Sequence, residues 1–543
     1  MTDPLLDLRA AVEDSVEVLR DGKAGDTRPT LERPPRPEMG DYSTNAAMLL
    51  APVRGEPPRD VAELLREELG GRLEGTAERI EVAGPGFVNL FLADRWHREG
   101  VELLVEAGDE IGSTTPEVAE QVLVEFVSAN PTGPLTVANG RGAAYGDSLA
   151  RVLTHAGHRV EREYYLNDVG TQMRLFAASI AARMKGEPVP EGGYEGAYVE
   201  DLAHELHAEG ADPSDLESLE QLGAGRMRAA IESTLDRFGV SFDTWSSERV
   251  VYESGSFDAT LEELRKRGHV YESEGATWLR TTEFGDDKDR VLVRSDGEPT
   301  YFAPDIAYHR DKLERADRLI DVLGADHHGY VARMRAALEA LGEDPDRFEA
   351  AIMQFVHLVE GEGRAQMSKR RGDFVTLDEL VDDIGTDAAR FLILQRSHDT
   401  TVDLDLELAR SQSQENPVYY VQYAHARIAS ILRKAGEARL DAALAAAGEA
   451  REAPAEPTER AMIKRLLELA DEVRSAAEQR APHRLTAYAT ATAADFHAFY
   501  RDCKVIDAEP VQLEHARLAL CVAARRVIAT TLDLLGVSAP ERM

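Results

Sequence analysis

The chain has 543 residues, of which 43% are hydrophobic, so it is long enough for about two to four domains, each with a core of its own. No apolar run is long enough to cross a bilayer, the start lacks an export signal, and two cysteines, Cys503 and Cys521, exclude a disulfide scaffold and a cysteine-rich zinc site. The formal net charge of −37 disfavours a polyanionic partner at long range, so any RNA-binding face must be a local basic patch. We therefore expect a cytoplasmic protein with no membrane partner and no structural metal.

The first predicted unit, residues 1–112, is a small α/β domain. Apolar residues recur at helical spacing from Leu5 to Leu19, and a Pro-rich, charged stretch follows. Residues 80–92 place apolar runs on either side of Gly84-Pro85-Gly86, which predicts a strand, a turn and a second strand.

The second predicted unit, residues 113–408, alternates strands and helices. Val122–Val127 is typical of a buried parallel strand, a Gly/Pro-rich turn follows, and residues 140–154 have apolar residues at helical spacing. This pattern predicts a Rossmann-like, doubly wound parallel sheet with ligands at the carboxyl ends of its strands. Further strands are predicted at Val160–Leu166, Val291–Val293, Leu319–Leu323 and Phe355–Val359, with helices such as Tyr330–Leu341 between them.

The third predicted unit, residues 409–543, is an all-α bundle, and almost the whole chain after Asp382 is expected to be helical. The low-complexity stretch from Ala442 to Pro457 is interpreted as a solvated loop between helices.

Three motifs carry most of the functional information: residues 125–134 (Glu-Phe-Val-Ser-Ala-Asn-Pro-Thr-Gly-Pro), residues 299–306 (Pro-Thr-Tyr-Phe-Ala-Pro-Asp-Ile) and residues 366–372 (Gln-Met-Ser-Lys-Arg-Arg-Gly). Together they resemble the arginyl-tRNA synthetases, a family of class I aminoacyl-tRNA synthetases. The segments 40–45 and 83–87 resemble that family's amino-terminal domain, and Asp387-Ala388-Ala389-Arg390 is similar to the Asp-Ala-Leu-Arg signature of its carboxyl-terminal domain.

The resemblance implies an arginine–tRNA ligase. Such an enzyme makes arginyl-adenylate from L-arginine and ATP with Mg²⁺, then transfers arginine to tRNA(Arg) and releases AMP and pyrophosphate. It also implies that the amino-terminal domain contacts the tRNA elbow and that tRNA is needed for the first step. We expect a monomer.

One motif departs from the family pattern, because Thr136-Val137-Ala138-Asn139 replaces the usual His-x-Gly-His tetrad. A turn that leads into a helix amino terminus suits anions, and Thr136 and Asn139 keep neutral donors, with Asn139 also a good helix cap. We assign both to catalysis and ATP binding, and Pro131 and Gly140 to ATP. The alternative is a plain connection in a non-catalytic tRNA- or arginine-binding paralogue.

Residues 366–372 resemble the mobile Lys-Met-Ser-Lys-Ser loop of the family, with Gln366 in place of the first lysine. A flexible ammonium can reach the charge that develops on pyrophosphate, so Lys369 is the predicted catalytic cation, with Met367 and Ser368 also assigned to ATP. On composition alone, a solvated basic loop would be the better interpretation.

A guanidinium substrate requires an anionic, hydrogen-bonding pocket. The resemblance assigns Asp305 to the guanidinium and places Tyr301 beside it, whereas an isolated Asp in an acidic chain is more often a surface residue. It also assigns Glu125, Ser128 and Asn130 to arginine, with Ser128 and Asn130 at the amino-acid head.

The segment 324–330 (Gly-Ala-Asp-His-His-Gly-Tyr) follows a predicted strand. Adjacent histidines at a strand end point to opposite sides, so a shared metal is disfavoured. The resemblance instead assigns Asp326 to the ATP ribose and His328 to arginine.

Aromatic residues alternate with polar ones in residues 416–427 and 495–500. Such faces can stack unpaired anticodon bases, although aromatics at helical spacing are more often core residues. Tyr419, Tyr423 and Arg427 are the predicted tRNA contacts.

Overall fold

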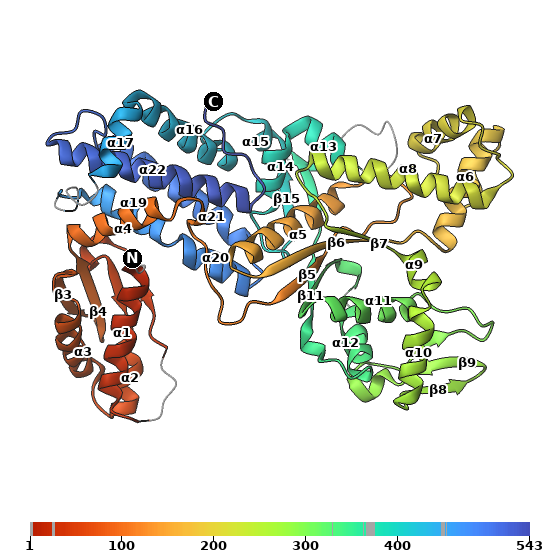
Figure 1. Ribbon diagram of the computed structural model, residues 1–543, viewed down its shortest axis with the longest axis horizontal. Helices are drawn as coiled ribbons and strands as arrows, with labels where there is room; N and C mark the ends of the chain where they lie inside the picture. The colour runs from red at the N-terminus through yellow and green to blue at the C-terminus, as the bar shows by residue number, and fades with distance from the viewer. Residues whose placement is uncertain are drawn as a thin grey trace.

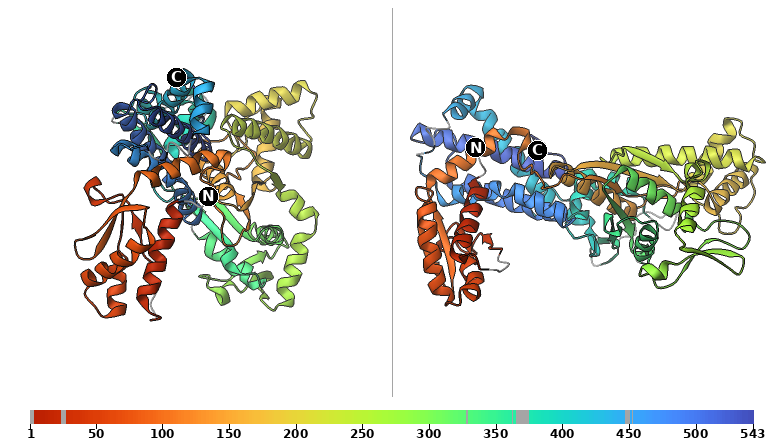
Figure 2. Two further views of the ribbon diagram at one scale, coloured as in Figure 1. Left: turned by 60° about the vertical axis from the view of Figure 1, so that its left-hand side comes forward. Right: turned by 60° about the horizontal axis from the view of Figure 1, so that its bottom comes forward.

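The chain forms an elongated molecule, with a small amino-terminal module at one end, helical and β insertions at the other, and a parallel sheet and a helical bundle between them (Figures 1 and 2). Our computed structural model describes residues 4–23, 28–327, 329–361, 363–364, 375–446, 451 and 453–543. None of the helices in these ranges is long and apolar enough to cross a membrane.

The amino-terminal module has an antiparallel sheet of strand order β1-β2-β4-β3, against which its helices pack. The predicted strand–turn–strand is confirmed as β3 and β4, and the first helix is α1, with Leu5, Leu8, Val12 and Val16 buried. Its elements are α1 (Pro4–Arg20), β1 (Leu31–Glu32), η1 (Pro37–Met39), β2 (Tyr42–Thr44), α2 (Ala46–Arg54), α3 (Pro58–Arg72), β3 (Ala77–Ala83) and β4 (Phe87–Leu92). Helix α4 (Asp94–Glu106) then packs on the bundle, and η2 (Gly108–Glu110) follows it.

The central sheet is fully parallel, with strand order β12-β11-β5-β6-β7. Because the chain starts at β5 and extends to both sides of it, the order reverses between β5 and β11, and ligands of doubly wound sheets bind at the carboxyl ends of strands at such a point. The predicted fold class is therefore confirmed. The strands are β5 (Gln121–Glu125), β6 (Arg159–Leu166), β7 (Thr244–Ser247), β11 (Arg318–Gly324) and β12 (Phe348–Met353).

Two predicted strands lie outside this sheet. Val291–Val293 belongs to β10 of a separate antiparallel sheet, β10-β9-β8, and Phe355–Val359 corresponds to β13 of a third sheet, β14-β13-β15. Their short apolar runs carry no information about which strands they pair with. These elements are β8 (Val270–Ser273), β9 (Ala276–Leu279), β10 (Arg290–Val293), β13 (Val356–Glu360), β14 (Gly363–Arg364) and β15 (Val402–Asp405).

Helices cover the sheet and fill the insertions between its strands. Helix α5 follows β5, three helices separate β6 from β7, and α11 and α12 flank β11. They are α5 (Val137–His155), α6 (Thr171–Lys185), α7 (Ala197–Ala208), α8 (Leu216–Arg237), α9 (Glu248–Glu253), α10 (Ser256–Lys266), η3 (Thr281–Phe284), α11 (Phe302–Arg315), η4 (Ala325–His327), α12 (Tyr330–Ala340), η5 (Pro345–Arg347), α13 (Leu377–Ile384), α14 (Thr386–Ile393) and α15 (Leu406–Arg410).

The carboxyl-terminal bundle is confirmed, although β15 interrupts the region that was expected to be helical. Its helices are α16 (Pro417–Ala435), α17 (Glu437–Ala445), α19 (Pro457–Leu467), α20 (Leu469–Glu478), α21 (His483–Asp502) and α22 (Val511–Leu534). The predicted loop from Ala442 was wrong at its start, because α17 continues to Ala445, and residues 447–450 and 452 lie outside the described residues.

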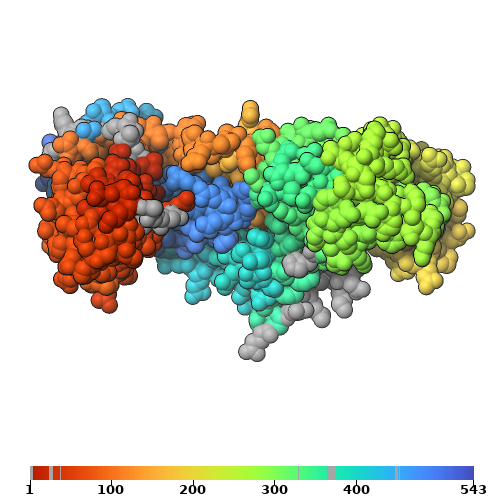
Figure 3. All heavy atoms as spheres, turned by 90° about the horizontal axis from the view of Figure 1, so that it is seen from below, coloured from red at the N-terminus to blue at the C-terminus, as the bar shows by residue number. Residues whose placement is uncertain are grey.

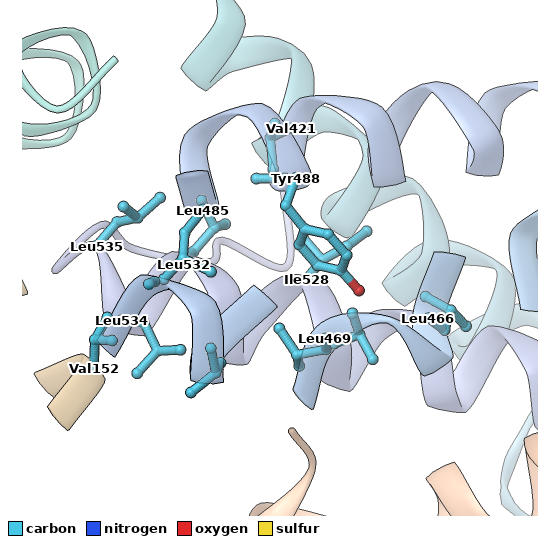
Figure 4. Close-up of a cluster of buried hydrophobic side chains, with 14 of the residues drawn as sticks. Val152, Val421, Leu466, Leu469, Leu485, Tyr488, Ile528, Leu532, Leu534 and Leu535 are labelled. Atoms are coloured by element: carbon cyan, nitrogen blue, oxygen red, sulfur yellow. The ribbon is translucent and has the colours of Figure 1, made fainter. Parts of the chain in front are cut away.

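The bundle core is continuous with the sheet domain. Tyr488 and Ile528 lie among leucines of α20, α21 and α22, and Val152 of α5 reaches the same cluster (Figure 4). In Figure 3, bundle residues lie between the amino-terminal module and the part of the molecule that carries α10 to α12.

The Asp-Ala-Ala-Arg segment, residues 387–390, stabilises the junction between the bundle and the sheet domain. Asp387 accepts a hydrogen bond from the backbone N–H of Ser538 at 2.9 Å. The buried Arg390 donates to the carbonyl of Leu535 at 2.9 Å and to Asp147 of α5 at 2.6 Å. Both charged residues of the motif therefore hold the last described segment of the chain, and Arg390 also ties it to α5.

Candidate active site

The turn before α5 is closed by a capping box. Thr136 is the N-cap: its hydroxyl donates to Asn139 Oδ1 at 2.8 Å, and its backbone N–H donates to the same oxygen at 2.9 Å. The backbone N–H of Asn139 donates back to Thr136 Oγ1 at 3.4 Å. The helix thus begins at Val137 rather than at residue 140, and Asn139 is its third residue rather than its cap. The hydroxyl of Thr136 and the side-chain oxygen of Asn139 therefore bond to each other. Of the polar side-chain groups of these two residues, the amide N–H groups of Asn139 alone have no partner among the described residues.

The same turn is joined to the chain that follows the Met-Ser-Lys segment. The backbone N–H of Val137 donates to Val375 O at 3.2 Å, and that of Leu377 donates to Leu135 O at 2.8 Å. Met367, Ser368 and Lys369 lie outside the described residues. The pairing nevertheless shows that the segment after residue 374 returns to the start of α5.

A row of three buried carboxylates crosses the sheet. Glu163 of β6, Glu125 of β5 and Asp321 of β11 occupy neighbouring register positions, so their side chains leave the same face of the sheet. They are 0%, 8% and 2% exposed. Three adjacent buried anions require cationic partners.

Helix α11 supplies those cations from residues spaced three apart. Lys312 Nζ donates to Glu125 at 2.7 Å and to Asp321 at 2.8 Å, and His309 Nε2 lies 2.8 Å from Asp321 Oδ2. One helical turn further on, Arg315 donates to Glu163 at 2.8 Å. Each carboxylate of the row therefore has a partner on one face of α11.

This cluster fixes the charge state of its members. Burial and Lys312 lower the pKa of His309, but the carboxylates of Asp321 and Asp305 outweigh them and raise it to about 10. Burial opposes ionisation of Asp321, yet Lys312 and His309 hold its pKa below the usual range. Burial and the charge of Asp321 raise the pKa of Glu125 against the pull of Lys312.

Asp305 lies in the first turn of the same helix. Its Oδ2 accepts a hydrogen bond from the hydroxyl of Tyr330 at 2.5 Å, and His309 Nδ1 lies 2.8 Å from its backbone carbonyl. The Asp305 side chain is 21% exposed, so a ligand can reach it.

The structure adds Glu248, which the sequence reasoning missed. It is the first residue of α9, directly after β7, so it stands at the carboxyl end of a strand of the parallel sheet. Burial, and then the charges of Asp305 and Asp168, raise the pKa of Glu248 to about 7. A carboxylate that is difficult to ionise beside another carboxylate marks a site suited to a cation.

Two buried aromatic rings pack near these carboxylates, and the hydroxyl of Tyr308 donates to Glu163 at 2.6 Å. Tyr165 and Tyr308 pack with ring centroids 4.4 Å apart, in a small cluster with Val251 and Ala307. The charges of Glu248, Asp305 and Glu125 act on Tyr165 and, with burial as the largest cause, raise its pKa far above the usual value. Tyr165 is thus a second residue near the site that sequence reasoning did not identify.

Tyr301 differs from these rings in being largely open to solvent. Its side chain is 66% exposed, and its hydroxyl accepts a hydrogen bond from Arg333 at 2.7 Å. It lies at the amino terminus of α11, as its N-cap residue, and so near Asp305 in the chain.

The residues after β5 form a bent connection to the turn before α5. Val127 and Ser128 have φ values of 69° and 39°, in the left-handed region that is costly for non-glycine residues. Ser128 Oγ donates to Glu125 Oε1 at 2.8 Å and accepts from the backbone N–H of Tyr165 at 3.2 Å. Asn130 is exposed and Pro131 is buried. Glu125 therefore has one oxygen on Ser128 and the other on Lys312.

Asp326 lies in η4, directly after β11, with an exposed side chain 2.9 Å from His327 Nδ1. His328 lies outside the described residues. Within the described part of the chain, no group of three or more His, Cys, Asp or Glu residues is arranged to hold a metal ion.

The three predicted tRNA contacts lie together on α16. The rings of Tyr419 and Tyr423 are stacked with centroids 6.3 Å apart. The guanidinium of Arg427 lies 4.7 Å from the ring centroid of Tyr423 and 4.9 Å from that of Tyr500 on α21. The sequence prediction thus named three members of one aromatic and cationic cluster, and it included Tyr500 only as part of the segment 495–500.

Comparisons with known proteins match this chain to arginyl-tRNA synthetases over nearly its whole length. Family profiles described as "Arginyl tRNA synthetase N terminal domain", "tRNA synthetases class I (R), catalytic domain" and "DALR anticodon binding domain" match residues 6–92, 102–200 with 215–430, and 421–543. The arginine–tRNA ligase of Geobacillus thermodenitrificans (strain NG80-2) is 46% identical over 528 residues, which cover 94% of each chain. That of Frankia alni (strain DSM 45986 / CECT 9034 / ACN14a) is also 46% identical over 528 residues and covers 95% of each chain.

The solved structures show the same architecture. Thermus thermophilus arginyl-tRNA synthetase superposes with a TM-score of 0.77 at 26% identity over 100% of both chains. The Plasmodium falciparum arginyl-tRNA synthetase, at 17% identity and a TM-score of 0.78, shares the fold. The chain therefore belongs to the arginyl-tRNA synthetase family of class I aminoacyl-tRNA synthetases, and it is an arginine–tRNA ligase that uses ATP as a substrate.

Proposed function

We propose that arginine is activated in the crevice at the carboxyl ends of β5, β7 and β11, with its guanidinium between Asp305 and Glu248. The observation that carries this proposal is the placement of two carboxylates: Asp305 is partly exposed in the first turn of α11, and Glu248 stands at the carboxyl end of β7. Burial and the charge of Asp305 raise the pKa of Glu248, and a bound guanidinium would neutralise that repulsion. Two carboxylates can also meet the five N–H donors of a guanidinium from two sides. Tyr301 and His328 are also assigned to arginine, and His328 lies outside the described residues.

The amino-acid head of arginine lies toward the end of β5. Ser128 and Asn130 offer a hydroxyl and an amide to the substrate carboxylate and ammonium, and Glu125 orients Ser128 through the hydrogen bond at 2.8 Å. Tyr165 and Tyr308 provide an apolar wall for the aliphatic part of the side chain.

ATP binds along the turn that leads into α5. The positive end of the α5 dipole favours anions, and the side-chain amide of Asn139 keeps N–H donors without a described partner, so we place Pro131, Thr136, Asn139 and Gly140 at the phosphate side. Asp326 holds the ribose. Met367, Ser368 and Lys369 are also assigned to ATP, and the Lys369 ammonium supplies positive charge that Thr136 and Asn139 cannot carry. Mg²⁺ accompanies ATP as part of the substrate.

These groups act mainly by positioning and by charge stabilisation. A carboxylate oxygen of arginine attacks the α-phosphorus of ATP, the bond to pyrophosphate breaks, and Lys369 stabilises the charge on the departing group. Thr136 and Asn139 preserve the shape of the turn through their capping box.

The tRNA is bound by the amino-terminal and carboxyl-terminal units. Residues 1–112 contact its elbow, residues 113–408 carry the chemistry, and residues 409–543 bind the anticodon of tRNA(Arg), with Tyr419, Tyr423 and Arg427 stacking on unpaired bases. The enzyme works as a monomer in the cytoplasm.

The pocket assignment is tested by the variants Asp305→Asn and Glu248→Gln, which remove charge at nearly constant shape. Loss of a desolvated, charge-assisted partner weakens arginine binding by about 2–5 kcal/mol. We expect both variants to bind ATP normally and to need far more arginine for charging of tRNA. An unchanged Michaelis constant for arginine in Asp305→Asn would contradict the assignment.

A further inference from the structure

We propose that Lys312 is a positioning residue of the arginine pocket, and that its contacts with Glu125 and Asp321 fix the position of helix α11, and hence of Asp305, over the sheet. This inference rests on the pocket assigned above. It concerns a residue that does not itself touch the substrate.

The two ends of the pocket stand on different elements. Glu125 ends β5, whereas Asp305 lies in the first turn of α11. Lys312 lies two helical turns after Asp305, and its side chain, 0% exposed, points into the sheet. Its ammonium bonds to Glu125 at 2.7 Å, so one contact ties the helix that carries Asp305 to the strand that leads to Ser128.

A second route runs through Asp321. Lys312 donates to Asp321 Oδ1 at 2.8 Å, His309 bonds to Asp321 Oδ2 at 2.8 Å, and the other ring nitrogen of His309 meets Asp305 O at 2.8 Å. A continuous chain of short polar contacts therefore runs from Glu125 to Asp305.

The register of the sheet restricts α11 to one position relative to the strands. Glu125 and Asp321 are direct register partners on β5 and β11, so their carboxylates present two adjacent acceptors at one height of the sheet. The ring of Tyr308 covers the ammonium at 4.8 Å from its centroid. A shift of α11 by one residue would separate the buried ammonium from both carboxylates.

Stability alone does not account for this cluster. Burying charges costs desolvation energy that the ion pairs roughly return, and apolar residues of similar volume are often equally stabilising. What an apolar residue cannot supply is the fixed direction of several hydrogen bonds. A displacement of about 1 Å at a reacting group can cost roughly a hundredfold in rate, so a fixed α11 has a functional value.

The test compares Lys312→Met with Lys464→Met in the full-length protein. Lys464 is the matched control, because it is also a buried lysine, with one carboxylate partner, Asp41, at 2.8 Å, but it joins the amino-terminal module to α19. Arginine binding is measured by calorimetry, and Michaelis constants for arginine and ATP are measured at saturating tRNA.

We expect Lys312→Met to weaken arginine binding roughly tenfold or more while the Michaelis constant for ATP changes by no more than about twofold, because displacement of the pocket acts on one substrate. Lys464→Met should leave arginine binding within about twofold of the parent, even where its thermal stability falls. A folded Lys312→Met protein with parental arginine affinity overturns the proposal, as does an equal loss of affinity for arginine and ATP.

A second variant separates positioning from stability. In Lys312→Met with Asp321→Asn, one cation and one anion are removed together, so thermal stability should recover relative to Lys312→Met, which can itself unfold. Arginine affinity should stay low because α11 is no longer held in place. Recovery of arginine affinity together with stability would show that Lys312 acts only on folding and would overturn the proposal.

Asp305→Asn distinguishes this inference from the pocket assignment. If Asp305→Asn binds arginine with parental affinity, the pocket assignment is wrong, and the role of Lys312 is wrong as well. Weakened binding in Asp305→Asn, combined with parental binding in Lys312→Met, keeps the pocket and overturns only the role of Lys312.

Discussion

Thr136 and Thr376 face each other across an isolated antiparallel bridge, and each is the N-cap residue of the helix that follows it. Both caps are capping boxes, the first completed by Asn139 and the second by Glu379. The turn that lacks the two histidines and the segment that follows Lys369 are therefore one structural unit. Changes on either side should disturb the other.

Gly140→Ala tests this coupling. An added Cβ would lie 2.6 Å from Leu377 Cδ1, and Leu377 is fully buried, so the Leu377 side chain or the two helices α5 and α13 must shift. We expect a stability loss of about 1–3 kcal/mol and a clear fall in the rate of ATP–pyrophosphate exchange.

The matched control is Gly142→Ala on the same helix. Its added Cβ would have Val322 Cγ1 as nearest neighbour, at an ordinary 4.0 Å. Because alanine favours helices over glycine, this variant should be neutral or more stable by up to about 1 kcal/mol. Equal behaviour of the two variants in thermal melts would show that the contact with Leu377 is not tight.

Thr136 and Lys369 should differ sharply in their effect on catalysis. Thr136→Ala removes a helix cap, which costs about 1 kcal/mol of stability, and Thr136→Ser should restore it. Lys369→Ala removes a charge that acts in the transition state, worth about 3–4 kcal/mol, and should reduce exchange far more. Exchange rates that fall equally in both alanine variants would count against Lys369 as the catalytic cation.

Arginine binding should depend on pH through Glu248. Its pKa is raised to about 7 in the empty site, and a bound guanidinium favours the ionised form and lowers that pKa. Affinity for arginine should therefore be constant above pH 7 and weaken as the pH falls below it, with proton release on binding near neutrality.

Calorimetry in two buffers of different ionisation enthalpy measures the released proton. Glu248→Gln should bind weakly and without this pH dependence between about pH 6 and 8, since the titrating group is absent. A Glu248→Gln protein with the parental pH profile would assign the titration to another group.

Arg390 should matter for stability more than for chemistry. Arg390→Met removes one of the cationic partners of the buried Asp147, at 2.6 Å, and frees the Leu535 carbonyl. Since Arg151 still pairs with Asp147 at 2.8 Å, a loss near the lower end of about 3–5 kcal/mol is expected. Arg410→Met is the control, because Arg410 is 39% exposed and its pairs should be worth about 1 kcal/mol or less. Chemical denaturation of both variants checks the difference, and similar losses would contradict it.

The long, apolar elements could be predicted from the sequence, and the short polar ones could not. Strand β6 was predicted with nearly its observed bounds, because its β-branched and aromatic residues are typical of a buried strand. Strand β7, Thr-Trp-Ser-Ser, has no such sequence pattern, and it is recognised as a strand only through its pairing with β6. Glu248 was missed for the same reason, because its place at a strand end became visible only with β7.

The contacts within the site could not be predicted from the sequence without knowing the fold. The spacing of His309, Lys312 and Arg315 was visible as one helical face, but the row of carboxylates beneath it depends on the register of β6, β5 and β11. The capping box is the opposite case. Thr136 and Asn139 have the spacing of that local motif, so the sequence could have predicted it.

The central claim is that this site activates arginine without the two histidines of the motif. Arginine-dependent exchange of pyrophosphate into ATP, measured with the purified protein and its own tRNA at low and at molar salt, tests that claim most directly. We predict exchange that requires both arginine and tRNA and that no other amino acid supports. Absence of exchange at every salt concentration, from a folded protein that still binds tRNA, would contradict the account and favour a non-catalytic paralogue.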